Sequence, residues 1–300
     1  MTTSSQVGHN SWPNVMALLG GEERPAWPLD KAREKCYYVD EEHRPLLLQE
    51  FGSHGWTTLY LEDFQLYGNF AREGKIGFRW PPVQHYFRAA YWAISKEKGL
   101  GGGGLRNRLV GKADNYACQQ ELPAHIHQFR LLDDLLTKQQ KPVFAYIHLN
   151  EYTHNDMAMA AQYDLPIKEL INSLSSRQAL DDTFFLLLAD HGFQRGDNPF
   201  TLTDQGKVEN NMPALMVVPP ASLASSHPQM VAALRGNGRG LTSHQDVYAT
   251  LREVLKMGAG TGVEERKTVG SSLLHPIAAR GCEGAGVPPQ FCSCTEGLLR

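Results

Sequence analysis

The sequence has no long hydrophobic run and no excess of basic charge. Its longest purely apolar stretch covers six residues, 184–189, whereas a membrane-spanning helix needs roughly 20. Lysine and arginine number 29 against 32 aspartates and glutamates, so the formal net charge is -3 and no basic field is available to hold nucleic acid. We therefore expect no membrane span in this chain and no nucleic-acid partner.

Two marks of secretion are also missing. Residues Met1–Gln6 are polar and supply no apolar core of a signal peptide, and no Asn-x-Ser/Thr glycosylation sequon occurs in the chain. Cysteine is scarce, yet Cys282, Cys292 and Cys294 all lie in the last 19 residues. A loop-rich tail closed by disulfides accounts for this crowding and implies an oxidising compartment, whereas five reduced thiols in the cytosol are the alternative.

The spacing of the cysteines limits how they pair. Cys292 and Cys294 are separated by one residue, which is too close for the usual zinc-finger pair, and no second pair of ligands follows. We expect Cys282 to pair with Cys292 or with Cys294. A bridge between Cys36 and Cys118 is a further option.

Apolar segments alternate with helical patterns along the chain. Strands are predicted at 56–61, 143–149, 183–189 and 214–218, and helices at 14–19, 45–51, 128–139, 165–174 and 246–255. This alternation predicts an α/β fold with a mostly parallel central sheet and helices on both faces. In such sheets ligands bind beyond the carboxyl ends of the strands.

The motif Asp190-His191-Gly192 follows the strand at 183–189 directly. A carboxylate beside a neutral imidazole is a good ligand pair for zinc or manganese, and the glycine permits a tight turn. A purely structural turn is the alternative.

A second polar cluster, 150–156, follows the strand at 143–149. It offers Glu151, His154 and Asp156 as ligands or acid–base groups, or else it is a polar loop that caps the next helix. Because two separate strands deliver acidic and imidazole groups to one edge, the pattern is typical of a metal hydrolase.

Ser11 and His244 each stand at the start of a predicted helix. A hydroxyl in this place lies in the positive field of the helix N-terminus, where a metal-bound serine could lose its proton and attack phosphorus. An N-cap serine is the alternative. His244 is either a third histidine ligand or a solvent-facing residue beside a cap formed by Ser243 or Asp246.

Together these motifs resemble the alkaline-phosphatase superfamily of alkaline phosphatases, nucleotide pyrophosphatase/phosphodiesterases, lipoteichoic acid synthases and sulfatases. Within it the chain is similar to a sulfatase-like family of animal proteins known mainly as a domain of unknown function. The matching segments, in chain order, are 10–14 with 18–21, 55–63, His154, 190–196, 206–209 with 212–213, 241–251, 270–274 with 280–282, and 291–294. The resemblance implies an alkaline-phosphatase-like domain over residues 1–275, followed by a cysteine-containing tail, 276–300.

The resemblance also implies roles for single residues. Ser11 matches the metal-activated nucleophile, and Asp190 and His191 match metal ligands. His154 matches a histidine that binds metal in the phosphodiesterases and contacts the transferred group in sulfatases, and His244 matches a third histidine. The implied cofactor is a divalent metal, zinc before manganese or calcium. The implied substrate is a small-molecule or glycan ester, and the implied location of the protein is outside the cell or in the secretory pathway.

Two departures from the family pattern matter. Asn150 stands where the phosphodiesterases have an aspartate, and no Asp or Glu precedes Ser11, where members carry an acidic ligand at the end of a first strand. We therefore expect the first strand to be missing, the chain to be N-terminally truncated, and its activity to be weak or absent.

The surroundings of Ser11 bear on the reaction. Sulfatase chemistry needs a formylglycine made in a motif that continues with proline and arginine, and here Pro13 is present without a nearby arginine. We therefore favour hydrolysis or transfer of phosphoesters through a phosphoserine at Ser11. The alternatives are a sulfate ester hydrolase, an inactive extracellular binding module without metal, and an intact hydrolase that recruits Glu151 as its missing ligand.

Overall fold

The chain folds into two units built from interleaved segments. The computed structural model describes residues 2–23, 36–63, 67–72, 76–88, 118–119, 122–154, 157–194, 203–260 and 262–293. Unit 1 comprises Met1–Asp30, His43–Leu47 and Gln178–Arg300, and unit 2 comprises Lys31–Glu42 and Leu48–Arg177.

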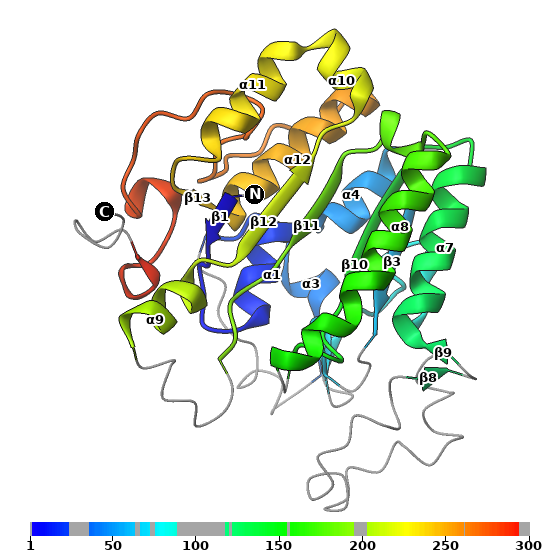
Figure 1. Cartoon of the computed structure of the whole chain (residues 1–300), viewed down its shortest axis with the longest axis horizontal. Helices are drawn as coiled ribbons and strands as arrows, with labels where there is room; N and C mark the ends of the chain where they lie inside the picture. The colour runs from blue at the N-terminus through cyan, green and yellow to red at the C-terminus, as the bar shows by residue number, and fades with distance from the viewer. Residues whose placement is uncertain are drawn as a thin grey trace, which may run out of the picture. The chain divides into compact units, whose positions relative to one another are not determined.

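A parallel three-stranded sheet forms the centre of unit 2. Its strands, in sheet order, are β10 (Val143–His148), β3 (Thr57–Glu62) and β7 (His85–Tyr86). β10 and β3 pair along their whole length, so both end at one edge with His148 opposite Glu62. Two helices, α7 (Ala124–Lys138) and α8 (Asp164–Ser176), pack against each other, and α7 also contacts β10 (Figure 1).

Shorter elements complete unit 2. A second sheet has the order β2 (Tyr37–Tyr38), β6 (Ile76–Gly77), β5 (Ala71–Arg72) and β4 (Tyr67–Gly68). The others are the pair β8 (Cys118–Gln119) and β9 (Leu122–Pro123), the helix α3 (Val39–Glu42), most of α4 (Leu47–Ser53) and the 3-10 helix η2 (Met157–Tyr163). The Phe51 ring on α4 stacks on Phe144 of β10, with ring centroids 4.1 Å apart.

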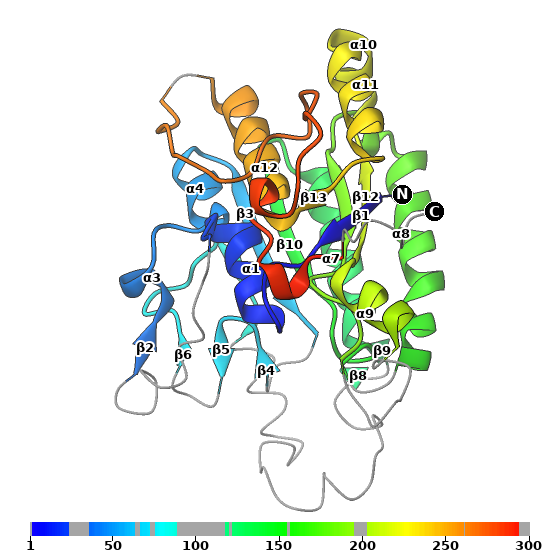
Figure 2. The same ribbon diagram turned by 90° about the vertical axis from the view of Figure 1, so that its left-hand side faces the viewer.

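Unit 1 has a four-stranded mixed sheet. Its strands, in sheet order, are β11 (Phe185–Leu188), β12 (Ala214–Val218), β1 (Thr2–Ser5) and β13 (Thr242–Ser243). β12 runs antiparallel to both neighbours, and β13 is parallel to β1. The helices α1 (Ser11–Gly20) and α12 (His244–Ala259) pack against each other (Figure 2).

The remaining elements of unit 1 are short. They are η3 (Ala179–Asp181), α9 (Asp204–Asn211), α10 (Ala221–Ser226), α11 (Pro228–Asn237), η5 (Glu283–Ala285) and η6 (Pro289–Phe291). Of the helices that the structure describes in either unit, none combines the length and the apolarity that a membrane crossing requires.

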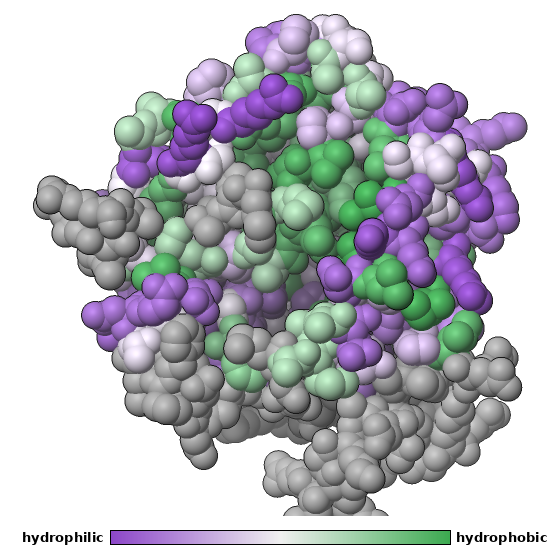
Figure 3. Space-filling view, viewed as in Figure 1, coloured by the Kyte–Doolittle hydropathy of each residue, from purple (hydrophilic) through white to green (hydrophobic). Residues whose placement is uncertain are grey.

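The α/β class predicted from the sequence is confirmed, but the strand directions differ between the units. The sheet of β10, β3 and β7 is parallel, as expected, whereas β11 and β12 are antiparallel. A continuous apolar run is typical of parallel strands buried on both faces, but it does not itself encode strand direction. The side chains of β11 and most of β12 are only half-buried, and hydrophobic side chains gather over these strands in Figure 3.

A short strand, β1, precedes Ser11, but it carries no acidic residue and so is not the acid-bearing first strand of the family pattern; the expected loss of that strand stays a prediction. β1 lies inside the sheet of unit 1, paired with β12 on one side and β13 on the other. Its residues are Thr and Ser, so no apolar pattern marks it, and its place is set by backbone pairing on both sides. No acidic residue lies in or after β1 before Ser11.

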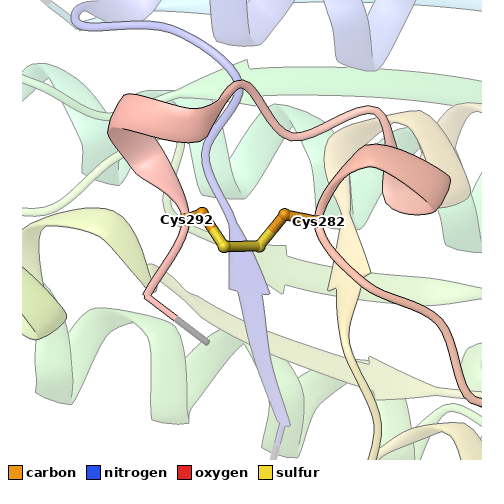
Figure 4. The surroundings of a disulfide bond; sticks show 2 residues. All are labelled: Cys282 and Cys292. Carbon is orange, nitrogen blue, oxygen red and sulfur yellow. A yellow bond between two sulfur atoms is a disulfide. The ribbon is translucent and has the colours of Figure 1, made fainter. Parts of the chain in front are cut away.

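The cysteine-containing tail lies within unit 1. Cys282 and Cys292 form a disulfide with 5.8 Å between their Cα atoms, which confirms one of the two expected pairings (Figure 4). The other candidate partner, Cys294, lies outside the described residues. Cys36 is a free, exposed cysteine, so the optional bridge to Cys118 is wrong. Local pattern could not exclude that bridge, because it depends on how distant segments fold together.

Candidate functional site

Ser11 is the first residue of α1, and the loop before it is held by Asn14. Asn14 is fully buried, and its Oδ1 accepts hydrogen bonds from the backbone N–H groups of Val7 (2.8 Å) and Gly8 (3.1 Å). Its Nδ2 donates to the carbonyl oxygens of Gly8 (2.8 Å) and Asn10 (3.0 Å). Asn10, with an extended backbone, takes the N-cap position. The alternative of an N-cap serine at residue 11 is therefore wrong, and the Ser11 hydroxyl is directed elsewhere.

The Asp190-His191-Gly192 motif follows the end of β11 and is pressed against the end of α9. The Gly192 N–H donates to the carbonyl oxygen of Asn210 at 2.9 Å. A Cβ atom on Gly192 would lie 2.5 Å from the Asn210 Cα and would also collide with the Glu209 carbonyl oxygen. The glycine is therefore needed for close approach of two backbone segments.

His191 presents one ring nitrogen to Ser11. Its Nδ1 lies 2.6 Å from the carbonyl oxygen of Gly192, which can only accept, so the proton is assigned to Nδ1. The Nε2 lone pair then faces the Ser11 hydroxyl, with Oγ at 3.3 Å, and Oδ2 of Asp190 lies 3.6 Å from the same nitrogen. The other Asp190 oxygen accepts from the His191 backbone N–H at 3.0 Å. A hydroxyl, an imidazole and a carboxylate thus meet at one point of unit 1.

His244 is the first residue of α12 and is fully buried. Its Nε2 lies 3.2 Å from the carbonyl oxygen of Ala189, the residue before Asp190. Burial lowers the pKa of His244, and the nearby Asp190 charge acts in the opposite direction. The cap formed by Ser243 and Asp246 is present, because the Ser243 N–H donates to Asp246 Oδ2 at 2.8 Å. A solvent-facing His244 is wrong, since its side chain is fully buried.

The donor atoms around Ser11 are of the kinds that bind zinc or manganese. Asp190 and His191 supply a carboxylate oxygen and an imidazole nitrogen, and Ser11 adds a hydroxyl. Among the residues that the structure describes, no group of three or more His, Cys, Asp or Glu side chains is arranged to hold a metal ion. Asp190 and His191 are thus two residues of metal-binding type beside Ser11, and the ring of His244 lies against the Ala189 carbonyl oxygen next to them.

His154 lies in unit 2, in the loop that follows β10. Its backbone N–H donates to the carbonyl oxygen of Asn150 at 2.9 Å, which closes a turn. Its part in a site with Ser11 stays a prediction, as does recruitment of Glu151. Asp156, the third group of this cluster, lies outside the described residues.

Two residues hold this loop, Asp63 and Tyr163, and neither was among the site residues predicted from the sequence. Oδ1 of buried Asp63 accepts from the backbone N–H groups of Asn150 (2.8 Å) and Glu151 (3.1 Å), and its Oδ2 accepts from the Tyr163 hydroxyl. The available signal was the position of Asp63 two residues after the predicted strand at 56–61. Asp63 thus ties the ends of β3 and β10 together.

The same loop contains a carboxyl group, that of Glu151, which is an unusually weak acid. Burial, reinforced by the charge of Asp63, raises the pKa of Glu151 to about 8. Burial also raises the pKa of Asp63, although its three hydrogen bonds oppose that shift. With its pKa at about 8, Glu151 keeps its proton near neutral pH.

Two solved structures are similar to this chain in fold at low sequence identity. One is a Bacteroides thetaiotaomicron protein designated 4S-sulf, from work on a core genetic locus for glycosaminoglycan metabolism. Its sequence is 14% identical to this chain and the TM-score is 0.48. The match covers 90% of this chain and 65% of that one. The other is Ps i-CgsB in complex with k-i-k-neocarrahexaose; it is 14% identical, with a TM-score of 0.47 and coverages of 88% and 64%. The chain thus spans just under two thirds of the length of each.

No curated protein matches the chain. A family described as "Protein of unknown function (DUF229)" matches residues 1–298. The chain belongs to this family.

Proposed function

We propose that the chain is a metal-dependent hydrolase or transferase of phosphate or sulfate esters, with an alkaline-phosphatase-like site in which Ser11 is the nucleophile. The observation that supports this most directly is the 3.3 Å approach of Ser11 Oγ to His191 Nε2, with Asp190 beside the same nitrogen. A serine at the start of α1, with an imidazole and a carboxylate from the segment after β11, suits nucleophilic attack on a tetrahedral ester.

Each residue has a separate task in this proposal. Asp190 and His191 would hold the metal, with His244 beside them, and a bound divalent ion would favour the ionised serine and offset the charge of the ester. Asn14 holds the loop before Ser11, so Oγ keeps one direction. The positive end of α1 favours an anionic ester at the same place. Ser11 would then form the new bond to phosphorus or sulfur as the alcohol leaves, and water would release the acid.

The test is hydrolysis by the purified chain with added zinc, manganese or calcium. An aryl phosphodiester, an aryl phosphomonoester and an aryl sulfate are offered in parallel, and the Ser11 peptide is examined by mass spectrometry for a covalent phosphate or sulfate. We expect low turnover, since Asn150 replaces an acidic residue of the family pattern, and complete loss in Ser11→Ala. The control is Ser225→Ala, an exposed serine on α10 of the same unit.

The outcomes separate the candidate functions. Turnover of the phosphoester alone supports phosphoester chemistry, and turnover of the aryl sulfate alone supports the sulfate ester alternative. Metal binding without turnover of any of the three esters would support a binding module and contradict the proposed enzyme. Activity that survives Ser11→Ala contradicts the proposed nucleophile.

We further propose that the protein works outside the cell or in the secretory pathway, on a small-molecule or glycan ester. The support for the compartment is the Cys282–Cys292 disulfide, because such bonds persist in oxidising surroundings. Mass spectrometry of protein isolated without reducing agent tests it: a free thiol at both positions would contradict the assignment.

A further inference from the structure

The loop closed by the disulfide, residues 282–292, is a small folded structure. The Val287 N–H donates to the carbonyl oxygen of Cys282 at 2.9 Å, and Gly286 turns the chain with a φ of 68°. Ala285, Val287 and Phe291 form a buried cluster, against which Leu241 and Cys282 pack. We call this segment the disulfide loop. Its cluster is completed by Leu241, which lies just before β13, so the loop is fixed to the body of unit 1.

The disulfide loop contacts the backbone that delivers His244. The hydroxyl of Ser243 donates to the carbonyl oxygen of Ala285 at 2.7 Å, and Ser243 is fully buried. Gly286 lies so close to α12 that a Cβ atom there would be 3.4 Å from the Gln245 side chain. The loop therefore touches the residues on either side of His244.

The same loop contacts the backbone that leads to Ser11. The Phe291 ring stacks with the ring of His9, two residues before Ser11, with centroids 6.5 Å apart and planes 22° apart. Figure 2 shows the red C-terminal segment beside α1 and β1, and in Figure 4 the blue strand β1 passes behind the disulfide. β1 and β13 are themselves paired there, with Ser5 opposite Ser243. The loop thus spans two strands at the point where each leads into a helix of the site.

We propose that the disulfide loop is a positioning element of the active site, which holds the start of α12, and with it His244, against the segment that carries Ser11. The inference rests on the proposed function of Ser11 and His244. Its physical basis is that one closed loop makes a buried hydrogen bond to Ser243 and a ring contact to His9, so opening the loop removes a support that the two segments share. The site would accordingly be complete in the oxidised protein and loosened in the reduced one.

Two kinds of variant test the proposal. Cys282→Ser combined with Cys292→Ser opens the loop, and Phe291→Ala keeps the disulfide but removes the contact with His9. Phe291→Leu, which retains apolar volume, serves as the conservative rescue. Val231→Ala is the matched control, because Val231 is a buried residue of α11 in the same unit and is not part of the loop cluster.

The first readout is hydrogen exchange followed by mass spectrometry on the full chain without metal. We expect the segments 6–10 and 241–246 to exchange at least about tenfold faster in the cysteine double variant and in Phe291→Ala. Phe291→Leu should lie near the wild type, and Val231→Ala should leave both segments unchanged. Unchanged exchange in these segments in both loop variants would overturn the proposal, whatever the metal does.

The second readout is zinc affinity by isothermal titration. We expect roughly tenfold weaker zinc binding in Phe291→Ala and in the double variant, because mutation of residues that orient metal ligands typically changes metal affinity by this factor or more. Val231→Ala should bind zinc with wild-type affinity. Faster exchange with unchanged zinc affinity would make the loop a clamp without a role in the site and overturn the proposal. If the wild type itself binds no zinc, manganese or calcium, the proposed function fails, while the exchange experiment still decides whether the loop holds the two segments.

Discussion

The substitution Asn14→Ala removes four hydrogen bonds at once from the loop that carries Ser11. The Asn14 side chain satisfies the N–H groups of Val7 and Gly8 and the carbonyl oxygens of Gly8 and Asn10, and it is fully buried. Each bond is worth about 0.5–1.5 kcal/mol net, and a buried group left without a partner costs about 1–3 kcal/mol. Alanine recovers roughly 0.5 kcal/mol through its helix propensity. We therefore expect the free energy of unfolding to fall by about 3–4 kcal/mol.

The measurement is urea unfolding followed by tryptophan fluorescence, with equal m-values required for the comparison. Asn14→Asp keeps the two bonds in which the side chain accepts and loses the two in which it donates, so it should be destabilising in the same direction. A loss below about 1 kcal/mol for Asn14→Ala would refute the reasoning, because the four bonds could then not all be buried and made.

Asn237 provides a matched control in the same unit. It is also buried, and its amide donates to the carbonyl oxygens of Leu273 (2.9 Å) and His275 (2.8 Å) and accepts from the Ile277 N–H (3.0 Å). Asn237→Ala should therefore lose a similar amount of stability. Only Asn14→Ala should also reduce the reactivity of Ser11, so equal effects of both variants on Ser11 would show that the loss is general.

Three further results are expected. Between pH 4.5, the ordinary pKa of a glutamate, and about pH 8, Glu151 keeps its proton in the folded chain and loses it in the unfolded chain. The free energy of unfolding therefore falls as pH rises through this window, by up to about 1.4 kcal/mol per pH unit from this group. Glu151→Gln should flatten the slope of urea midpoints against pH, and an unaltered slope would contradict the assignment. Gly192→Ala should lower the melting temperature and stability by about 1–3 kcal/mol, because its Cβ meets the backbone at the end of α9; an unchanged melting temperature would show that the turn is not crowded. Phe51→Ala should cost about 3–5 kcal/mol in urea unfolding, because the buried ring stacks on Phe144; a cost below about 1 kcal/mol would mean that this packing is not maintained.

The sequence by itself determined the strands whose pattern is local. The predicted strand at 214–218 coincides with β12, and that at 143–149 differs from β10 by one residue. The helix predicted at 246–255 lies within α12. Hydrophobic periodicity reports these elements because neighbouring residues along the chain decide which side chains are buried. β1 gave no such signal, since its Thr and Ser residues form a strand only through partners more than 200 positions away.

For the candidate site, the sequence supplied the residue types and the tertiary structure supplied their relations. The motif Asp190-His191-Gly192 at a strand end and Ser11 at a helix start were apparent from local pattern. Their approach across 180 positions, the direction of the His191 lone pair and the burial of His244 follow from how β11, α1 and α12 pack. The same holds for Asp63. The sequence shows a carboxylate after a strand, but its partners, the backbone N–H groups of Asn150 and Glu151, are known only once the end of β10 is placed beside it. Local sequence fixes which groups are available, and packing between distant segments decides which of them meet, because contact depends on the path of the whole chain.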